Sequence, residues 1–187
     1  MKLRAEMAED SIDRDKLVQD LGEVERLVKE GVAYARSAHG NHEQASRIDL
    51  ASFIESLAYD YQDTGKAVTI EELGDGAIVT RPHALRRILT NLIDNALKFA
   101  GSAEIEVQRQ ESAVFIRVLD RGPGIPNSQL QAVLQPFFRL EQSRNRETGG
   151  TGLGLAIAQQ LATAIGATLT LRNRVGGGLV AEIALRQ

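Results

Sequence analysis

The sequence contains no cysteine and only three histidines. The absence of cysteine excludes disulfide bonds and a zinc site built on Cys and His ligands, so nothing in the chain requires an oxidising compartment. Long apolar runs are missing as well: no stretch reaches the ~20 residues that span a bilayer, and the first ten residues lack the apolar core of a signal peptide. We therefore expect a cytoplasmic chain, with any membrane anchor of the full protein outside it.

An excess of charge of one sign is missing too. The 187 residues carry a net charge of -3, which gives no electrostatic reason to bind nucleic acid. The hydrophobic fraction of 43% is ordinary for a soluble globular protein. The length suits one well-packed domain plus an appendage.

The appendage is predicted near the N-terminus, where residues 13–36 read as one long helix. Its apolar positions are spaced alternately by four and three residues, the heptad pattern, and charged residues fill the positions between them. A heptad stripe normally packs against a second helix, and residues 2–8 would form only a short part of one. The pattern therefore suggests a helical bundle completed by another chain. The seam consists of Leu17, Leu21, Val24, Val28, Gly31 and Ala35.

Polar residues 39–47 predict a linker between this partial helical hairpin, residues 1–38, and a second domain, residues 48–187. In the second domain short apolar strands mix with amphipathic helices. This order predicts an α/β (α+β) sandwich, a mixed sheet of about five strands covered on one face by three helices. We expect strands at 48–50, 67–71, 77–80, 103–109, 114–119, 167–173 and 179–185, and helices at 52–61, 86–99 and 153–165, with a short helix near 128–134.

The helix over residues 86–99 has a polar stripe opposite its apolar face. At about 100° per residue, Asn91, Asn95 and Lys98 fall on one side, along a line about 10 Å long. Two amide oxygens and one positive charge suit a triphosphate with its Mg²⁺, because Mg²⁺ takes few protein oxygens alongside substrate phosphates. The alternative is an ordinary solvated helix face. The apolar face comprises Leu85, Leu89, Leu92, Ile93, Ala96 and Leu97.

Two glycine-rich segments follow this helix. DRGPGIP, residues 120–126, ends a predicted strand, and its glycines allow a tight turn that a ligand can approach closely. GGTGLGL, residues 149–155, leads directly into a helix, whose first N–H groups can bind phosphate. Each segment alone also fits an ordinary turn. Their occurrence in this order, after the polar helix, indicates a nucleotide site.

Together these segments resemble the catalytic, ATP-binding domain of sensor histidine kinases, within the superfamily that also holds gyrase, heat-shock chaperone and mismatch-repair ATPases. NLIDNALKF resembles the N box of that family, DRGPGI its G1 box, PFFR at 136–139 its F box, and GGTGLGL its G2 box. The resemblance extends over residues 48–187. Residues 13–36 resemble the second helix of the family's dimerisation and phosphoacceptor hairpin.

The resemblance implies a site for ATP and Mg²⁺. Asn95 would ligate Mg²⁺, and Asn91 and Lys98 would contact phosphates. Phe99 would flank the adenine, and Asp120 would bind the adenine amino group. Further positions implied at the base are Gly122, Gly124 and Ile125, and those implied at the phosphates are Gly150, Thr151, Gly152, Leu153 and Gly154.

A lid over the nucleotide is also implied, at residues 138–149. Its composition is polar and bounded by glycine, and it carries Arg144 and Arg146, with Arg139 near its start. Any of these arginines could neutralise the γ-phosphate; the alternative is a charged loop that is merely solvated.

Asn91 separates the possible relatives. In the hydrolysing members and in anti-sigma serine kinases, the residue four before the metal-binding Asn is a Glu that acts as general base. An amide cannot accept a proton from water or serine, which favours transfer to an imidazole that is already nucleophilic. Asp94 could instead polarise the acceptor. The alternatives are a nucleotide-binding module without catalysis and, less favoured because of Asn91, a serine kinase or ATPase.

The phosphoacceptor string of the family is missing from this sequence. The histidines present, His39, His42 and His83, fit surface or capping roles, so we expect this chain not to phosphorylate itself. The resemblance implies an acceptor outside this chain and a cognate response regulator as partner. It also implies a homodimer in the full-length kinase and a bacterial inner-membrane sensor whose membrane segments are missing here. Because the bundle seam is only half supplied, we expect this fragment to be monomeric or to self-associate weakly.

Overall fold

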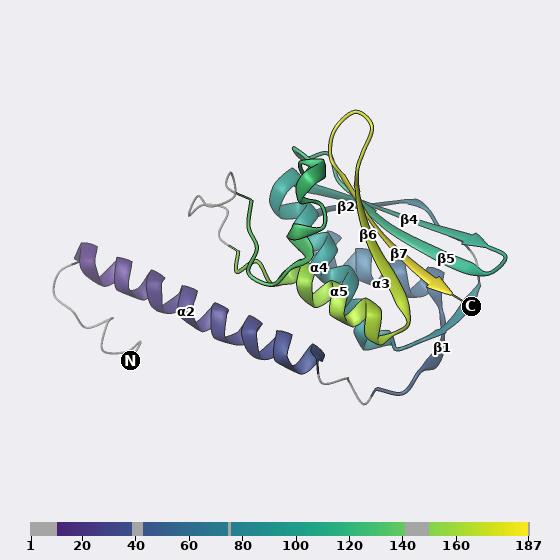
Figure 1. Cartoon of the computed structure of the whole chain (residues 1–187), viewed down its shortest axis with the longest axis horizontal. Helices are drawn as coiled ribbons and strands as arrows, with labels where there is room; N and C mark the ends of the chain where they lie inside the picture. Colours follow the sequence, from purple (N-terminus) through teal and green to yellow (C-terminus); the bar gives the residue numbers. More distant parts are fainter. Residues whose placement is uncertain (1–10, 39–42, 75, 141–149, 187) are drawn as a thin grey trace.

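The computed structural model describes residues 11–38, 43–74, 76–140 and 150–186. In these residues a long helix precedes a mixed α/β unit (Figure 1). The elements are α2 (Ser11–Ala38), β1 (Ser46–Asp49), α3 (Leu50–Gln62), β2 (Ala67–Glu72), β3 (Ala77–Thr80), α4 (Pro82–Ala100), β4 (Ser102–Gln110), β5 (Ala113–Leu119), the 3-10 helices η1 (Asn127–Gln129) and η2 (Ala132–Leu134), α5 (Gly154–Ala164), β6 (Ala167–Asn173) and β7 (Leu179–Arg186).

Five strands form the main sheet, in the order β2-β4-β5-β7-β6. The β2–β4 pair is parallel, and the other pairs are antiparallel. This sheet is mixed, as the sequence predicted. The remaining strands, β1 and β3, pair antiparallel in a separate two-stranded sheet.

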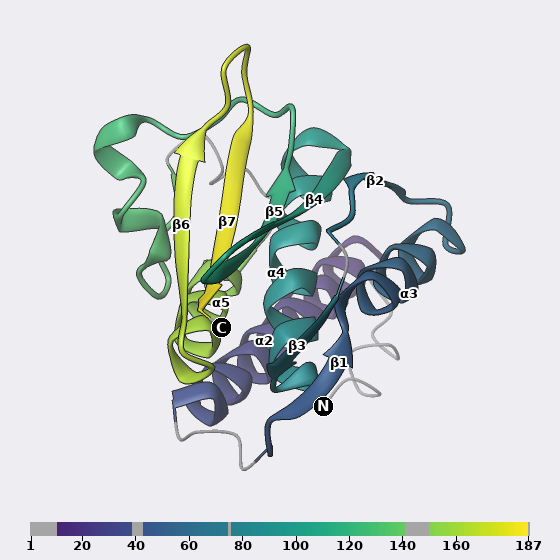
Figure 2. The ribbon, with the colours of Figure 1, turned by 90° about the vertical axis from the view of Figure 1, so that its right-hand side faces the viewer.

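The helices α3, α4 and α5 cover one face of the main sheet (Figure 2). Alternate residues of each strand point into the helical layer, since successive side chains of a strand face opposite sides. On β4, for example, Ile105 and Val107 are buried, whereas Glu104 and Glu106 lie on the open face. The predicted α/β sandwich is confirmed.

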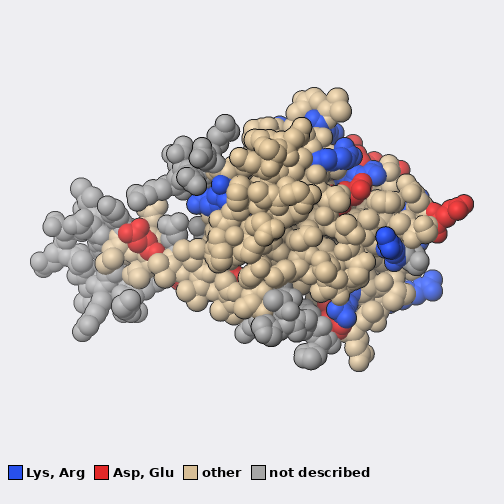
Figure 3. Space-filling view, in the orientation of Figure 1, with Lys and Arg blue, Asp and Glu red and all other residues tan. Residues whose placement is uncertain are grey.

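The open face of the sheet carries paired charges. Arg117 bonds Glu182 at 2.6 Å and approaches Glu106 at 3.6 Å, and Arg174 bonds Glu104 at 2.7 Å. The hydrogen bond from Arg174 lowers the pKa of the Glu104 carboxyl below its ordinary value. Side chains of both signs are interspersed around the sheet on the face seen in Figure 3.

The long helix α2 covers the predicted span 13–36 and packs against α5. Tyr34 of α2 reaches the main core, and the Glu30 carboxylate accepts a hydrogen bond from the Thr151 hydroxyl. Several apolar side chains of α2 are exposed, among them Leu17, Val24 and Val28 of the predicted seam. The seam therefore presents an apolar stripe to the outside, while another side of α2 contacts this chain.

Two sequence expectations differ in detail. The short helix expected near 128–134 is two 3-10 turns, because its backbone hydrogen bonds join residues three apart, such as Gln129 and Pro126, rather than four apart. β1 begins inside the predicted linker, and residues 39–42 of that linker lie outside the described residues. The hairpin stub at 2–8 also lies outside them. No helix among the described residues has the length and apolar content to cross a membrane.

Candidate functional site

The site is organised on α4. This helix begins with Pro82 in its first turn and ends at Gly101, whose positive φ of 75° terminates it. Its first N–H groups are capped from far away in the sequence: the Glu43 carboxylate accepts hydrogen bonds from the backbone of His83 at 2.7 Å and of Ala84 at 3.0 Å. The predicted apolar face is buried against the sheet and α5, so the orientation of the polar stripe is determined by core packing.

The amide of Asn91 faces the start of α5. Its Nδ2 donates to the Arg87 carbonyl at 2.7 Å, which orients the group. Its Oδ1 would lie 3.2 Å from a Cβ at Gly154, so a larger residue there would press on the amide. The first turn of α5 has no side-chain cap, because the N-cap residue is Leu153. The N box and the G2 box therefore meet at an uncapped helix N-terminus.

Asn95 and Lys98 continue the stripe along α4, the former half-buried and the latter exposed. The Lys98 ammonium lies 4.9 Å from the centroid of the Phe99 ring. The charge expected at the phosphates and the ring expected at the adenine are thus held close together at the C-terminal end of the helix.

Asp94 lies on another side of α4. Its Oδ1 accepts a hydrogen bond from the Tyr61 hydroxyl of α3 at 2.8 Å. Burial, and then this carboxylate, raise the pKa of Tyr61. Asp94 therefore has a structural partner, and its expected action on a phosphoacceptor stays a prediction.

Asp120 lies at the end of β5 and is buried, with 7% of its surface exposed. Its Oδ1 accepts hydrogen bonds from the backbone N–H groups of Gly122 at 2.8 Å and Leu179 at 3.1 Å. Both bonds end on one oxygen, so the second carboxylate oxygen can accept an N–H from a ligand. A Cβ at Gly122 would lie 3.2 Å from the Phe99 carbonyl, so this loop closes against the end of α4.

The F box holds the G2 box in place. The Phe137 N–H donates to the Gly152 carbonyl at 3.0 Å, and Phe137 itself has a φ of 63°. Gly152 has a φ of 75°, and a Cβ there would approach the Phe138 carbonyl to 2.8 Å. Next to it, the buried Thr151 hydroxyl accepts from the Leu153 N–H at 3.3 Å. Phe137 is 64% exposed, so its backbone rather than its ring anchors the segment.

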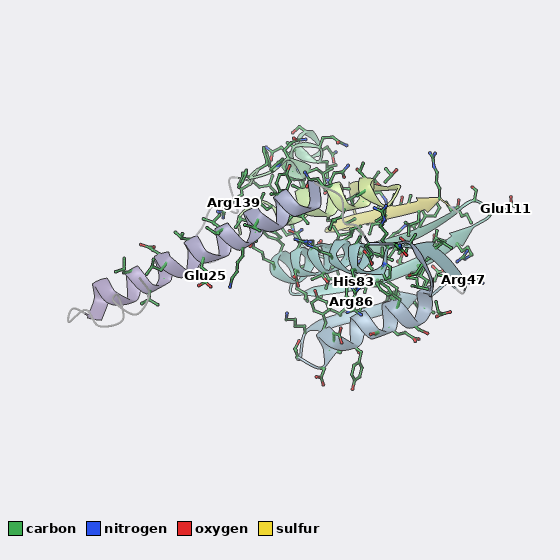
Figure 4. All side chains as sticks on the ribbon, turned by 90° about the horizontal axis from the view of Figure 1, so that it is seen from below. Glu25, Arg47, His83, Arg86, Glu111 and Arg139 are labelled. Atoms are coloured by element: carbon green, nitrogen blue, oxygen red, sulfur yellow. The ribbon has the colours of Figure 1, made fainter. Side chains whose placement is uncertain are left out.

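Parts of the expected site lie outside the described residues. These are Arg144 and Arg146 of the lid and the linker histidines His39 and His42. Arg139 is described and half-buried, and Figure 4 places it in a different part of the molecule from His83. His83 is exposed at the start of α4, where its backbone is capped.

The donor set fits a nucleotide. At one end of α4, the Asn91 amide oxygen lies against the first turn of α5, whose N-terminus has no side-chain cap, an arrangement that suits phosphate. At the other end, a buried carboxylate is aimed by two backbone N–H groups, an arrangement that suits an amino group of a base. The stripe of two amides and one ammonium joins them.

The comparisons with known proteins agree with this geometry. Residues 80–187 match the family described as histidine kinase-, DNA gyrase B-, and HSP90-like ATPases. The chain belongs to this family. It is 34% identical over 187 residues to the sensor histidine kinase GtrS of Pseudomonas aeruginosa, covering 99% of this chain and 38% of that protein. It is 32% identical to the sensor protein RstB of Escherichia coli, covering 95% of this chain and 43% of the relative.

Solved structures share the fold. The full-length ShkA structure in complex with AMPPNP aligns with a TM-score of 0.73 at 22% identity, over 95% of this chain and 39% of that one. The histidine kinase AdeS of Acinetobacter baumannii gives a TM-score of 0.73 at 18% identity, over 99% of this chain and 91% of that one. The chain corresponds to the ATP-binding catalytic region of sensor histidine kinases, as the sequence predicted, and spans about two fifths of the two named relatives, 38% and 43%.

Several residues that build the site were missed from the sequence. Asn173 and Leu179 hold the G1 loop, Glu43 caps α4, and Tyr61 holds Asp94. Each acts across a long separation in the chain and belongs to no short motif. The glycine run at 176–178 was the one available signal, because a run of glycines at a hairpin end indicates that another backbone passes close by.

Proposed function

We propose that this chain binds Mg-ATP and transfers its γ-phosphoryl group to a histidine on a protein segment outside it. The observation that carries the proposal is the position of the α4 stripe. A glycine of the G2 box lies against Asn91 at one end, and the G1 loop closes on the Phe99 carbonyl at the other. A nucleotide laid along the stripe would reach Asp120 with its base and the start of α5 with its phosphates.

In this proposal each polar group has one task. Asn95 holds Mg²⁺, which would neutralise phosphate charge when bound. Asn91 and Lys98 contact the phosphates, and the N–H groups over Gly150, Gly152 and Gly154 add donors at the helix N-terminus. Thr151 and Leu153 are assigned to shape the phosphate-binding turn, since the Thr151 hydroxyl accepts from the Leu153 N–H. Arg139, Arg144 and Arg146 are assigned to neutralise the γ-phosphate.

At the base, Asp120 accepts a hydrogen bond from the adenine amino group and Phe99 packs beside the ring. The residues assigned to shape this end are Gly122, Gly124 and Ile125. Selection of the base therefore rests on one buried carboxylate, because a ligand without the amino group leaves that acceptor unpaired.

The amide at Asn91 argues for transfer to histidine rather than hydrolysis. A neutral amide cannot take a proton from water or a serine hydroxyl, whereas a neutral imidazole can attack phosphorus without that help. The chain would then contribute mainly positioning and charge neutralisation, which account for most of the catalysis of phosphoryl transfer. Asp94 is assigned to polarise the acceptor.

The wider setting belongs to the same proposal. Residues 1–38 would be part of a dimerisation and phosphotransfer hairpin, residues 39–47 a linker, and residues 48–187 the catalytic domain. The names of the relatives support a response regulator as the downstream partner. The full-length protein would form a homodimer through the exposed stripe of α2, with this region on the cytoplasmic side of a bacterial inner membrane.

Phosphotransfer in trans tests the proposal. The chain is mixed with γ-labelled ATP, Mg²⁺ and a separate acceptor hairpin from a sensor kinase relative, and acid-labile label on the hairpin is measured. We expect labelling that requires this chain, and none with Asn95→Ala. ATP binding without any transfer would favour a binding module, and steady ADP release without acceptor would favour a hydrolase.

The chain alone supplies the matching control. Because it lacks the acceptor string, we expect it to remain unlabelled under the same conditions. Acid-labile label on His39, His42 or His83 would contradict the assignment of the acceptor to another segment.

A further inference from the structure

The end of the β6–β7 hairpin holds the G1 loop, residues 120–125, at both of its ends. Asn173 is the last residue of β6 and pairs with Leu179, the first residue of β7. The Leu179 N–H donates to Asp120 Oδ1 at 3.1 Å, and the Asn173 side chain bonds the backbone of Ile125. A single register position of the hairpin therefore contacts the first and the last residue of the loop.

The Asn173 amide replaces a strand neighbour for Ile125. Its Oδ1 accepts from the Ile125 N–H at 2.9 Å, and its Nδ2 donates to the Ile125 carbonyl at 2.7 Å. The second Nδ2 proton goes to Asn127 Oδ1 at 2.8 Å. Ile125 is buried, and buried backbone groups need partners, so this one side chain supplies what regular structure would otherwise supply.

Gly124 gives the amide its space. It has a φ of 72°, and a Cβ there would lie 2.8 Å from Asn173 Oδ1 and 3.3 Å from the Gly178 carbonyl. The sequence suggested that this glycine admits the base of a nucleotide. In the structure the Cβ direction of Gly124 points at the hairpin, so a glycine at this position also allows the contact with Asn173.

We propose that Asn173 is a positioning residue for base selection, which rests on the function proposed above. It bonds the loop rather than Asp120 itself. By holding Ile125 it keeps the turn at Gly122 closed, and the Gly122 N–H in turn aims the Asp120 carboxylate. Releasing the far end of the loop should let that carboxylate move away from the position where it meets an adenine amino group.

The substitution Asn173→Asp tests this with almost no change of shape. It removes both Nδ2 donors and sets a carboxylate oxygen against the Ile125 carbonyl and Asn127 Oδ1. Binding is measured by calorimetry with Mg²⁺ for ATP, for inosine triphosphate, which lacks the amino group, and for inorganic tripolyphosphate. We expect ATP to bind about tenfold more weakly, since hydrogen bonds that align the acceptor are lost. Inosine triphosphate should change less, and tripolyphosphate should not change.

Two variants serve as controls. Asn127→Ala removes only the third bond of the amide and should keep the preference for ATP. Thr170→Ala alters an exposed position of the same strand that contacts neither the loop nor its partners, and should match the original chain for all three ligands. If Asn173→Asp melts below the assay temperature, Asn173→Ser gives the same comparison without a new charge.

The outcomes separate this inference from the proposed function. An original chain that binds ATP no better than inosine triphosphate would overturn the assignment of Asp120 to the adenine amino group. An original chain that prefers ATP, with a variant that keeps the full preference, would overturn the role of Asn173 alone. Equal weakening for all three ligands would also overturn it, because that pattern indicates general loss of structure.

Discussion

The two ends of the α4 stripe are built differently. At the end that we assign to the base (the base end), hydrogen bonds from Leu179 and Asn173 of the hairpin hold Asp120 and Ile125. At the end that we assign to the phosphates (the phosphate end), Asn91 is oriented by one bond to its own helix, and the first turn of α5 has no side-chain cap. The base end is therefore held by contacts between distant parts of the chain. The phosphate end consists of a helix N-terminus without a side-chain cap and an amide held by its own helix.

The difference follows from what each end would have to recognise. A base is selected by one fixed hydrogen bond, so a preformed acceptor avoids the entropic cost of ordering a loop on binding. Phosphates carry charge, and helix N–H groups and cations attract them without a single exact geometry. We therefore expect substitutions at the phosphate end to reduce affinity while the fold is kept, and substitutions at the base end to reduce stability as well.

The largest effect on binding is expected from Asn95→Ala. Removing partners of metal ligands typically costs 10- to 100-fold in affinity, so loss of the ligand itself should weaken Mg-dependent binding of an ATP analogue by at least about a hundredfold. The melting temperature should not change, because Asn95 is only half-buried. Titration calorimetry with and without EDTA measures the Mg-dependent affinity, and scanning calorimetry measures the melting temperature. Unchanged affinity would remove Asn95 from the metal site.

The largest effect on stability is expected at the hairpin, from Gly178→Ala compared with Gly176→Ala. Both glycines have positive φ, 103° and 90°. A Cβ at Gly178 would lie 2.0 Å from the Asp120 carbonyl, whereas nothing lies within 4 Å at Gly176. Backbone strain at a positive φ destabilises both variants. Because of the clash, Gly178→Ala should lower the free energy of unfolding by at least about 2 kcal/mol more than Gly176→Ala does. Equal losses in urea denaturation would contradict the close approach.

A smaller effect is expected from Tyr61→Phe, which removes the hydrogen bond to Asp94. We expect about 1 kcal/mol lower free energy of unfolding. The folded state raises the pKa of Tyr61 above its ordinary value of 10.0, so this contribution is present below about pH 10 and is lost as the pH rises further. The stability of the original chain should therefore fall more steeply above pH 10 than that of the variant. If the free energy of unfolding falls equally steeply with pH in both proteins, the contribution of the Tyr61 hydroxyl would be contradicted.

The smallest effect is expected from Glu30→Ala on α2. The Glu30 carboxylate bonds Thr151 beside the phosphate end, where a negative charge opposes phosphate. Its removal should raise ATP affinity by a factor of about two to five, an electrostatic gain that high salt reduces. Glu25→Ala removes the same charge from an exposed position of α2 that pairs with Lys29, and should leave affinity unchanged. A matching change in both variants would assign the effect to net charge.

Sequence patterns predicted most of the secondary structure because apolar periodicity is local. The predicted strand at 77–80 and the predicted β6 at 167–173 have the observed bounds, and α4 contains the predicted helix. The pairing of β1 with β3 was not predicted, since register depends on which edges the tertiary fold leaves available. The two 3-10 turns are too short to give a periodic signal.

By itself the sequence determined the elements, the mixed sheet and the family, because the boxes are short contiguous strings with fixed spacing. Only the tertiary structure decided which groups aim the site. Asn173 bonds Ile125 across 48 residues of the chain, and Leu179 bonds Asp120 across 59 residues. A lone asparagine and a backbone N–H carry no pattern along the chain. They gain a role only when the hairpin folds back onto the loop and buried polar groups must find partners.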